Sequence, residues 1–367
     1  MAGWIEHTSV LGFGEAAHAY WQEHDKLLKE EYDTRALRYL EASKQARDFS
    51  LLPGTGLLAE HYDTEPVAIG AGWHGVVLKA SRQGQEYAIK MFTSDNFSAA
   101  AKEVVMLLYT SMTPKRDDQC ARVLTAYTSH FRARLGAKYY KKLLADARER
   151  GDTLVAAEIS GGRTNYLKNE AVCFVETRFE NGSNMEHLIQ ANSAGPALSF
   201  QQNLGVLLSL VAAVRCLHRN FIYHKDIYPR NIVIVDYTTA TPHAVLLDFG
   251  IACMLDQCAP ASQYAFQQEA QTRKVDRDEQ YMDIQNCLDA IYDWLSGARH
   301  VNPRSIPSPK KSGSTYAVLW EVVERVWSTT HRRYDEENLD LHPTLEKVPP
   351  LSAVEIYTEL NALVAAV

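Results

Sequence analysis

The stretch from Tyr223 to Ala252 constrains the fold more than any other part of this chain. Two short apolar runs, I-V-I-V and A-V-L-L, are separated by a polar segment, a pattern typical of two strands joined by a turn. Asp226 and Asn231 precede the first run, and Asp248 follows the second. Paired strands would bring an acid, an amide and a second acid to one end, which is the side-chain set that phosphoryl transfer needs.

Composition sets the broad class. A chain of 367 residues can bury a large core and is expected to form two or more lobes. The net charge is −7, so the overall charge favours neither nucleic-acid nor membrane binding. The first residues lack the features of a signal peptide, and the longest apolar run, Leu204–Val214, is about half a membrane span. Six cysteines without a C-x-x-C pair are interpreted as reduced thiols, which predicts a cytoplasmic or nuclear protein.

A glycine-rich segment lies upstream, with glycines at 70, 72 and 75. G-x-G-x-x-G alone is a weak signal, and in a dinucleotide-binding fold a helix should follow it. Here two strand-like runs, V-V-L-K-A and E-Y-A-I-K-M-F, follow. This order favours a hairpin lid over a nucleoside triphosphate, because glycines let the backbone approach phosphates closely.

The second of these strand-like runs contains the motif A-I-K, whose lysine is Lys90. An ammonium group there would reach a triphosphate if a carboxylate held it in place. Glu103 is the only acid between Asn96 and Arg116, and it lies in a helix-like stretch among residues expected to face inward. We therefore expect Lys90 and Glu103 to form an ion pair.

The N-terminal half outside these motifs gives weaker signals. One or two helices are expected within Ala16–Asp48, with Leu37 and Leu40 on their apolar faces. A strand is expected at 121–127, followed by a basic, solvated helical insertion from His130 to Arg150.

The C-terminal half gives clearer helices. Residues 171–189 predict a buried strand, a crossing segment whose backbone is available to a nucleobase, and the start of a helix. Phe200–Arg219 predicts an apolar core helix. A helix over 281–295 would place Asp283 in its first turn, where an acid suits the helix dipole. Further helical patterns cover Val318–Trp327 and Ala353–Val364.

Taken in order, these motifs resemble the signature set of the protein kinase superfamily over roughly residues 65 to 300. The resemblance implies an α+β, bilobal protein kinase-like fold with a small antiparallel sheet in the N-lobe and a mostly helical C-lobe. The implied organisation is a helical N-terminal extension (1–64), an N-lobe (65–178) with a helical insertion at about 129–165, and a C-lobe (179–367).

The resemblance also implies roles for individual residues. Asp226 would be the catalytic base, and Lys90, paired with Glu103, would contact the α- and β-phosphates. Asn231 and Asp248 would be metal ligands. Asp283 matches the acid that anchors the backbone of the catalytic loop in kinases. The implied cofactors are ATP and Mg²⁺, or Mn²⁺ in its place. The remaining nucleotide-binding positions would be Gly70, Gly72, Gly75, Val77, Ala88, Glu176 and Arg178.

Four features depart from the kinase pattern. Lys225 replaces the usual arginine before the catalytic Asp, and lysine lacks the bidentate phosphate clamp of arginine. Tyr228 stands where serine/threonine kinases usually carry a lysine near the γ-phosphate. An Ala-Pro-Glu motif is missing between Gly250 and Asp283, and the chain after Asp283 is short for a full kinase lobe.

Three functions follow from this pattern. The first is a divergent serine/threonine protein kinase, with ATP and a protein substrate as partners and neither nucleic acid nor membrane. The second is a small-molecule phosphotransferase with a kinase-like fold, and the third is an ATP-binding pseudokinase or scaffold. Under each of them, the N-terminal helices or the basic insertion at 130–150 would serve partner docking.

Overall fold

The structure, a computed structural model, divides the chain into two compact units. The sheet unit consists of Thr34–Pro114 and Thr125–Glu180, and the helical unit consists of Met1–Asp33, Lys115–Leu124 and Asn181–Val367. The structure describes residues 22–23, 26, 32–72, 75–92, 97–112, 120–161, 170–191, 198–255, 268–297, 352–353, 356–358 and 360. The helix expected at Val318–Trp327 and most of the one at Ala353–Val364 lie outside these residues.

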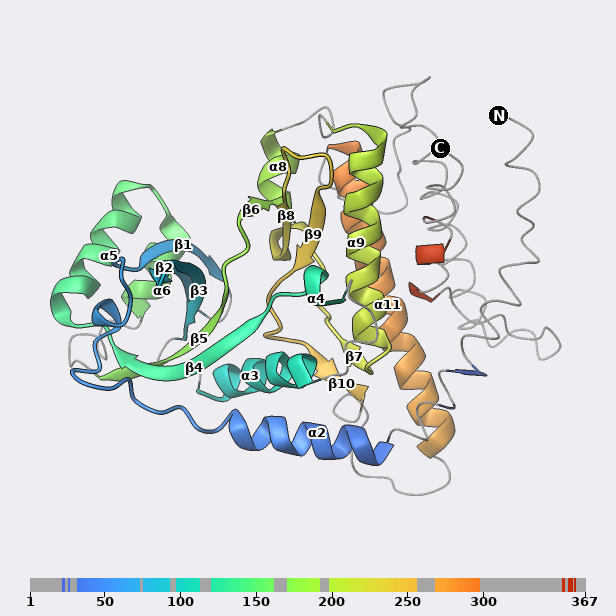
Figure 1. Ribbon diagram of the computed structural model, residues 1–367, viewed down its shortest axis with the longest axis horizontal. Helices are drawn as coiled ribbons and strands as arrows, with labels where there is room; N and C mark the ends of the chain where they lie inside the picture. Colours follow the sequence, from blue (N-terminus) through green and yellow to red (C-terminus); the bar gives the residue numbers. More distant parts are fainter. Residues whose placement is uncertain are drawn as a thin grey trace. The chain divides into compact units, whose positions relative to one another are not determined.

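The sheet unit is built on a five-stranded antiparallel sheet (Figure 1). The strands are β1 (Val67–Gly72), β2 (Gly75–Arg82), β3 (Gln85–Met91), β4 (Tyr127–Arg134) and β5 (Ala171–Arg178), in the order β1-β2-β3-β5-β4. Gln83 and Gly84 form the turn between β2 and β3, with φ angles of 53° and 75°. Two successive positive φ angles match the twist of paired strands. This turn leads into the register that places Val77 opposite Lys90.

The two faces of this sheet carry different side chains, because successive residues of a strand point to opposite sides. Directly paired residues share a face, so Val77, Lys79, Ala88 and Lys90 lie together on one side, which we call the Lys90 face. The opposite, outer face is mostly apolar and buried, although it also carries the buried carboxylate of Glu176. Its core includes Ala68, Val76, Leu78, Ala80, Ile89, Met91, Phe131, Ala133, Val172 and Phe174.

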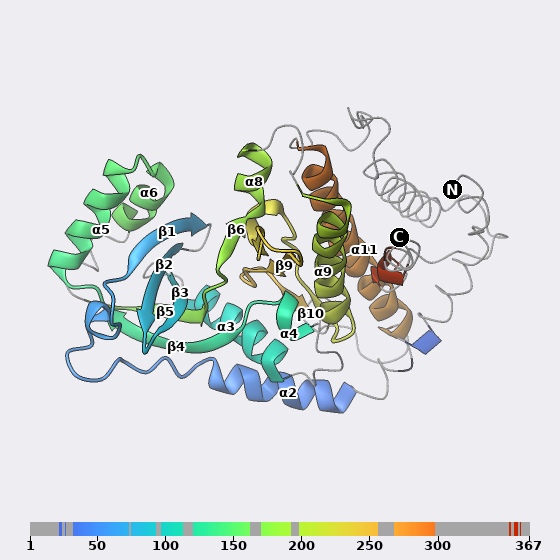
Figure 2. The ribbon, with the colours of Figure 1, turned by 45° about the horizontal axis from the view of Figure 1, so that its top comes forward.

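The insertion between β4 and β5 covers the outer face. Its helices α5 (Ala137–Glu149) and α6 (Thr153–Gly161) lie beside β1 in both views (Figures 1 and 2). Their apolar side chains join the sheet core, namely Tyr139, Tyr140, Leu143, Ala147, Val155 and Ile159. The expectation of a solvated insertion is therefore wrong, because the insertion is part of the core of the sheet unit.

Two local predictions near the insertion are also corrected. The expected strand at 121–127 is a short helix, α4 (Cys120–Val123), followed by the first residue of β4. The helix expected from His130 begins only at Ala137, because 130–134 belong to β4 and pair with β5. Cross-strand pairing with a distant segment outweighed local helical character here.

The N-terminal segment of the sheet unit combines an α-helix with a stretch of turns and irregular chain. Helix α2 (Tyr32–Gln45) buries Ala42 but leaves Leu37 and Leu40 exposed, so these two leucines do not form the buried face expected of them. After α2 the chain consists mainly of turns and irregular segments with the short 3-10 helix η1 (Leu58–Glu60), and it adds Leu52, Leu58 and Tyr62 to the outer-face core.

Helix α3 (Phe97–Met112) also belongs to the sheet unit and contacts β4 and β5. The guanidinium of Arg38 in α2 lies 5.4 Å from the centre of the Tyr109 ring in α3, which is within the range of a cation–π contact. Glu103 is one of the buried residues of α3. The expected inward orientation of this acid is thus confirmed.

The helical unit surrounds a three-stranded antiparallel sheet. Its strands are β6 (Gly182–Asn184), β8 (Ile232–Val235) and β9 (His243–Leu246), in the order β6-β8-β9, while β7 (Ile222–Tyr223) pairs with β10 (Cys253–Met254). Its helices are α4, α8 (Met185–Ala191), α9 (Phe200–His218), α11 (Gln268–Ser296) and the short 3-10 helix η2 (Pro229–Asn231). The strands expected at the two apolar runs, the buried strand β5 and the core helix α9 are confirmed.

Helix α9 is the centre of the helical unit. It begins with a capping box in which Ser199 accepts the Gln202 backbone N–H and the Gln202 side chain accepts the Ser199 N–H. It lies beside α11 (Figure 1), and Trp294 of α11 donates a buried 2.9 Å hydrogen bond to Asn203 of α9. Among the described helices α9 alone has the length and apolar composition of a membrane span, but two thirds of that apolar window is buried inside the protein. These are the properties of a core helix.

The cysteines differ from the expectation that all six are reduced. Cys216 and Cys253 are disulfide-bonded, whereas Cys173 and Cys287 are free and buried. Burial raises the pKa of both free thiols. The cysteines therefore no longer argue for a reducing compartment, and a cytoplasmic or nuclear location stays a prediction.

Candidate active site

The Lys90 face of the sheet unit carries a buried ion pair. Lys90 Nζ lies 2.8 Å from Glu103 Oε2, and the two side chains are only 10% and 6% exposed. The central strand β3 fixes Lys90, and helix α3 presents Glu103 from its buried side. A lysine held this way offers an ammonium at a fixed position on the sheet, which is what recognition of a phosphate as a point charge requires.

The glycine-rich segment forms the hairpin that the sequence predicts. Gly72 pairs with Gly75 across its tip, and Gly70 pairs with Val77. Gly75 has a φ of 149°, and a Cβ atom there would lie 2.0 Å from the Met91 carbonyl oxygen. Glycine is therefore required at 75 by the close approach of β2 to the end of β3. A Cβ at Gly70 would meet no atom within 4 Å, so its backbone is open to an approaching group.

Apolar side chains accompany Lys90 on its face. Val77 lies directly opposite Lys90 in the sheet, and Ala88 lies two residues before it in β3; both are half-buried. Ile69, immediately before Gly70, sits at the irregularity in the β1–β2 register and is 47% exposed. This combination of accessible aliphatic groups beside a fixed cation suits a ligand with a flat apolar part and a charged part.

Glu176 and Arg178 do not take the position expected of them. Glu176 lies opposite Ile89, so its side chain points to the outer face, away from Lys90. The backbone of 176–178 is paired with β3 on one side and β4 on the other, and the Arg178 N–H donates to the Ala126 carbonyl. A central strand has little unpaired backbone, so a backbone contact to a nucleobase would have to come from residues after Arg178, where β5 ends.

Glu176 instead forms the centre of a buried polar cluster. Its carboxylate accepts hydrogen bonds from the Tyr62 hydroxyl at 2.5 Å, from Arg82 at 3.0 Å and from Ser129 at 3.0 Å. Arg82 also contacts the ring nitrogen of His61. Burial, followed by the neighbouring Glu176, raises the pKa of the Tyr62 phenol far above its usual value. The cluster ties the N-terminal segment to β2, β4 and β5.

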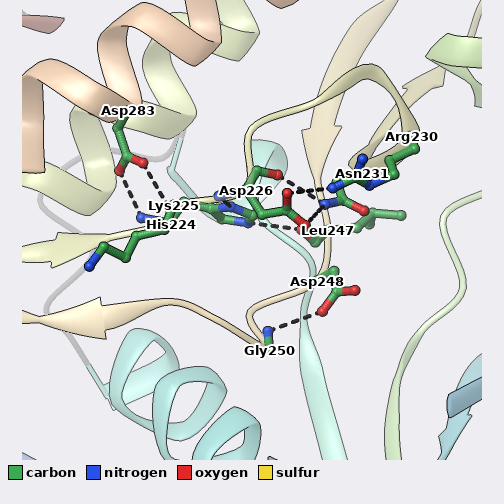
Figure 3. A network of polar contacts seen from close by, with 9 residues as sticks. All are labelled: His224, Lys225, Asp226, Arg230, Asn231, Leu247, Asp248, Gly250 and Asp283. Carbon is green, nitrogen blue, oxygen red and sulfur yellow. Dashed lines mark hydrogen bonds and ion pairs between the residues drawn. The ribbon is translucent and has the colours of Figure 1, made fainter. Parts of the chain in front are cut away.

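The loop between β7 and β8 carries the polar site of the helical unit (Figure 3). The Asn231 amide nitrogen donates to Asp226 Oδ2 at 2.7 Å and to the Asp226 carbonyl at 2.9 Å. Arg230 donates to the other carboxylate oxygen, Oδ1, at 2.6 Å. Proline at 229 suits the short 3-10 turn that brings Arg230 and Asn231 back to Asp226.

Asp248 reaches the same end of the strand pair as Asn231. Ile232 pairs with Leu246, and the Leu247 N–H donates to the Asn231 carbonyl at 2.8 Å, so the residues flanking β8 and β9 lie side by side. Asp248 has a φ of 58°, and one of its carboxylate oxygens accepts the Gly250 N–H at 3.0 Å. Such a backbone conformation is sparsely populated for residues other than glycine and is concentrated at functional sites.

The side-chain oxygens of Asn231 and Asp248 suit a hard cation that also takes ligands from outside the protein. The Asn231 amide nitrogen is used by Asp226, which leaves the amide oxygen for a metal ion. Among the described residues there is no group of three or more His, Cys, Asp or Glu side chains that could hold a metal by itself. Mg²⁺ typically takes one or two protein oxygens and fills its octahedron with phosphates and water. Asn231 and Asp248 therefore match a metal that is bound together with a phosphate substrate.

Asp283 holds the backbone before Asp226. Its carboxylate is fully buried and accepts the N–H groups of His224 and Lys225, each at 2.7 Å (Figure 3). It also contacts His218 Nε2 at 3.2 Å. The anchoring contacts implied by the resemblance are present. The helix-dipole argument is wrong, however, because α11 begins at Gln268 and Asp283 lies in its interior.

His224 is a buried structural link within the loop. Its Nε2 donates to the Leu247 carbonyl at 2.9 Å, and its Nδ1 accepts the Asp226 N–H at 3.3 Å. This pattern requires a neutral imidazole, with one nitrogen donating and the other accepting. Burial lowers the pKa of His224, against the opposing effect of Asp283 and other nearby carboxylates. His224 thus connects the strand end at Leu247 to the backbone of Asp226.

Two contacts of the loop at Asp226 were missed by sequence reasoning. Arg230 binds the carboxylate of Asp226, and Glu279 of α11 binds the side chain of Lys225 at 2.8 Å. The spacing of Arg230, four residues after Asp226, is visible in the sequence, and so is the spacing of Glu279, four residues before Asp283. The i, i+4 spacing places Glu279 and Asp283 on one face of a helix once the helix is known to extend that far.

The chain has partial similarity to known kinases. Death-associated protein kinase 2 from Homo sapiens is 26% identical over 125 residues, which cover 32% of this chain and 34% of that protein. The probable serine/threonine-protein kinase zyg-1 from Caenorhabditis briggsae is 28% identical over 177 residues, which cover 44% of this chain and 24% of that protein. No protein-family model matches the chain. The chain thus spans about a third or less of the length of these relatives, and it contains a protein kinase-like region.

Proposed function

We propose that this chain is an ATP- and Mg²⁺-dependent kinase that phosphorylates serine or threonine hydroxyls of proteins. The observation that carries the proposal is the arrangement of Asp226, Asn231 and Asp248 at one end of the β8–β9 pair. One carboxylate is positioned beside an amide, and a second carboxylate approaches from the adjacent strand end (Figure 3). The similarity to two protein kinases supports the same reaction class.

The reaction divides among these groups in a simple way. Asp226 accepts the proton of the substrate hydroxyl as its oxygen bonds to the γ-phosphorus, and the bond from that phosphorus to the ADP oxygen breaks. Asn231 and Asp248 would hold Mg²⁺, which when bound neutralises charge on the phosphates. Lys90, fixed by Glu103, would contact the α- and β-phosphates. Positioning and charge neutralisation thus supply the rate enhancement.

Arg230 offers a cation where the usual lysine is absent. Tyr228 occupies that position, and the guanidinium of Arg230 lies 4.7 Å from the centre of the Tyr228 ring. Arg230 is bound to Asp226 at 2.6 Å and is 56% exposed, so it can exchange this carboxylate for a phosphate oxygen. We infer that Arg230 neutralises the γ-phosphate beside the catalytic base, with Tyr228 holding the guanidinium by stacking.

The nucleobase would lie on the Lys90 face of the sheet unit. Ile69, Val77 and Ala88 offer aliphatic surface there, and the hairpin backbone at Gly70 is open to phosphate oxygens. Because β5 is paired with β3 and β4, we do not assign this role to Glu176 and Arg178.

The test uses ATP labelled on its γ-phosphate, with Mg²⁺ or Mn²⁺, offered to a protein lysate and to a metabolite pool. We expect label on serine or threonine of protein. Asp248→Ala should lower transfer by about a hundredfold or more, which is the usual effect of removing a group that stabilises transition-state charge. The exposed-residue control Glu149→Gln should match the wild type. Label on a metabolite would instead identify a small-molecule phosphotransferase, and nucleotide binding without transfer would identify a pseudokinase.

A further inference from the structure

Strand β1 of the glycine-rich hairpin lies at an edge of its sheet. It is the terminal strand in the order β1-β2-β3-β5-β4, and its register with β2 shifts between Ala68 and Gly70. This irregularity and the glycines weaken the hold of β2 on the strand, because glycine has more conformational freedom than any other residue. An edge strand opens more readily than a central strand that is paired on both sides. The position of β1 therefore depends on what else contacts it.

The insertion between β4 and β5 contacts the chain on both sides of Val67. The Tyr139 hydroxyl of α5 donates a buried 2.5 Å hydrogen bond to the Pro66 carbonyl, and Arg150 Nη1 donates to the Ala68 carbonyl at 2.9 Å. Burial raises the pKa of the Tyr139 phenol far above its usual value, so its hydroxyl stays protonated and able to donate. Side-chain donors of the insertion thus satisfy backbone carbonyls at the start of this edge strand.

Arg150 lies at the end of α5, in the turn that leads to α6. Gly151 has a φ of 71°, and its N–H donates to the Arg148 carbonyl at 3.0 Å, while the Asp152 N–H donates to the Ala147 carbonyl at 2.9 Å. This pair of bonds is the Schellman motif, which ends a helix at a residue in the left-handed region, usually glycine. The backbone that carries Arg150 is therefore fixed by a turn that Gly151 makes possible.

The two helices of the insertion are themselves packed on the sheet. Leu143 of α5 and Val155 of α6 belong to the same buried core as Ala68 of β1. Helix α6 contacts both β1 and β2, and the two helices lie beside β1 in both views (Figures 1 and 2). The insertion is thus a packed support from which two side-chain donors reach the backbone before the glycines.

Simple stabilisation of the sheet does not account for the contact of Arg150. This residue is exposed and adds little to the buried core, yet it holds Ala68, the last residue before the register shift. Gly70 follows two residues later, and its backbone is open to an approaching group. A hairpin that is already in place binds a ligand more tightly, because binding does not have to order it first.

Resting on the proposed function, we propose that the α5–α6 insertion braces the β1–β2 hairpin, with Arg150 and Tyr139 as positioning residues for nucleotide binding. Each acts through a backbone carbonyl of the segment that leads to Gly70, and not through a contact with ATP. Loss of either donor lowers the fraction of molecules whose hairpin is ready to bind. The apparent Kd for ATP rises by the inverse of that fraction, so a fall to about one fifth raises it about fivefold.

The first measurement is hydrogen–deuterium exchange in the full chain without nucleotide. Arg150→Met and Tyr139→Phe each remove one donor and keep most of the bulk of the side chain, and each should speed exchange in β1 about fivefold. Exchange in β3 should stay unchanged, because that central strand is paired on both sides. Arg148→Met, at an exposed arginine in the last turn of α5, removes the same charge and is the matched control.

The second measurement separates ATP binding from chemistry. The Kd for ATP with Mg²⁺, measured by titration calorimetry, should rise about fivefold in both variants. The kcat at saturating ATP, with the acceptor found for the wild type, should stay within about twofold. Arg150→Lys keeps a cationic donor and should return the Kd to within about twofold of the wild type. A merely structural role of the insertion would instead lower the thermal midpoint and speed exchange in β1 and β3 together.

The outcomes distinguish this inference from the proposed function. If the wild type binds ATP and transfers phosphate, the inference fails alone when β1 exchange or the Kd is unchanged in either variant, or when β3 opens together with β1. A fall in kcat without a rise in Kd, or an Arg150→Lys variant as weak as Arg150→Met, would overturn it as well. If the wild type binds no ATP, the proposed function fails and the positioning role fails with it, even where β1 exchange responds.

Discussion

The Lys90–Glu103 ion pair gives the sharpest quantitative prediction. The 2.8 Å separation corresponds to an attraction of about 6 kcal/mol at an effective dielectric constant of about 20, before the cost of removing both groups from water. Substituting Lys90→Met keeps the length of the side chain but leaves the Glu103 carboxylate buried and without this cation. Breaking a buried pair in this way costs about 3–5 kcal/mol.

The assay is hydrogen–deuterium exchange on peptides from β3 and α3, which reports the local opening free energy of the sheet unit. We expect Lys90→Met to lower that free energy by about 3 kcal/mol or more. The double variant Lys90→Met with Glu103→Leu should also lose opening free energy. Its loss should be smaller than the sum of the losses in the two single variants by at least about 2 kcal/mol, because the double variant buries no unpaired charge. Lys138→Met, at an exposed lysine of α5, is the control.

The same variants test function. Phosphoryl transfer should be lost in Lys90→Met and in the double variant, although the double variant regains stability. If Lys90→Met changes the opening free energy by less than about 1 kcal/mol, the pair is solvated like a surface salt bridge. The argument that Glu103 fixes Lys90 for phosphate binding would then be refuted.

Three further predictions concern other parts of the fold. Asp283→Asn removes a charged acceptor from buried backbone N–H groups, and each such hydrogen bond is worth about 1.5–3 kcal/mol. Amide hydrogen exchange at Lys225 should therefore accelerate. Unchanged protection of this amide would contradict the anchoring role of Asp283. His224 has a lowered pKa in the folded state, so the unfolded chain binds more protons as pH falls below about 6.5 and stability should drop there. Urea unfolding between about pH 7 and pH 5 should show that drop, and a His224→Gln variant with an equal drop would count against it. Leu143→Ala should cost about 2–5 kcal/mol by calorimetry, because the α5 side chain is buried on the sheet, and a loss below about 1 kcal/mol would mean that the insertion is peripheral.

Local sequence patterns were sufficient to predict the structure of segments that depend mainly on neighbouring residues. The apolar runs after Asn231 and before Asp248 are strands, and the apolar stretch from Phe200 is the core helix α9. The glycine hairpin was also predictable, because Gly75 has a positional requirement that other residues cannot meet. The assignment of ATP, Mg²⁺ and a protein acceptor stays a proposal.

Long-range pairing was not visible in the sequence. The backbone around Glu176 was expected to contact a nucleobase, but that backbone is paired with β3 and β4, and register with Ile89 turns the Glu176 side chain to the outer face. The extent of α11 places Asp283 in the interior of the helix rather than in its first turn, while its buried contacts with the loop are those that the kinase resemblance implied. The N-terminal leucines Leu37 and Leu40 are exposed, because contacts of α2 selected a different face.

By itself, the sequence determined the identity and order of the groups that suit phosphoryl transfer, since these depend on residue type and on spacing along single strands and loops. It also determined that Lys90 had one nearby acid as a partner within the following helix. Only the tertiary structure decided how the loop at Asp226 is held. Arg230 and His224 reach it within the same local turn, whereas Glu279 and Asp283 reach it from a helix far along the chain. Side chains that meet across such separations carry no local periodic signal, so only the folded core reveals their contacts.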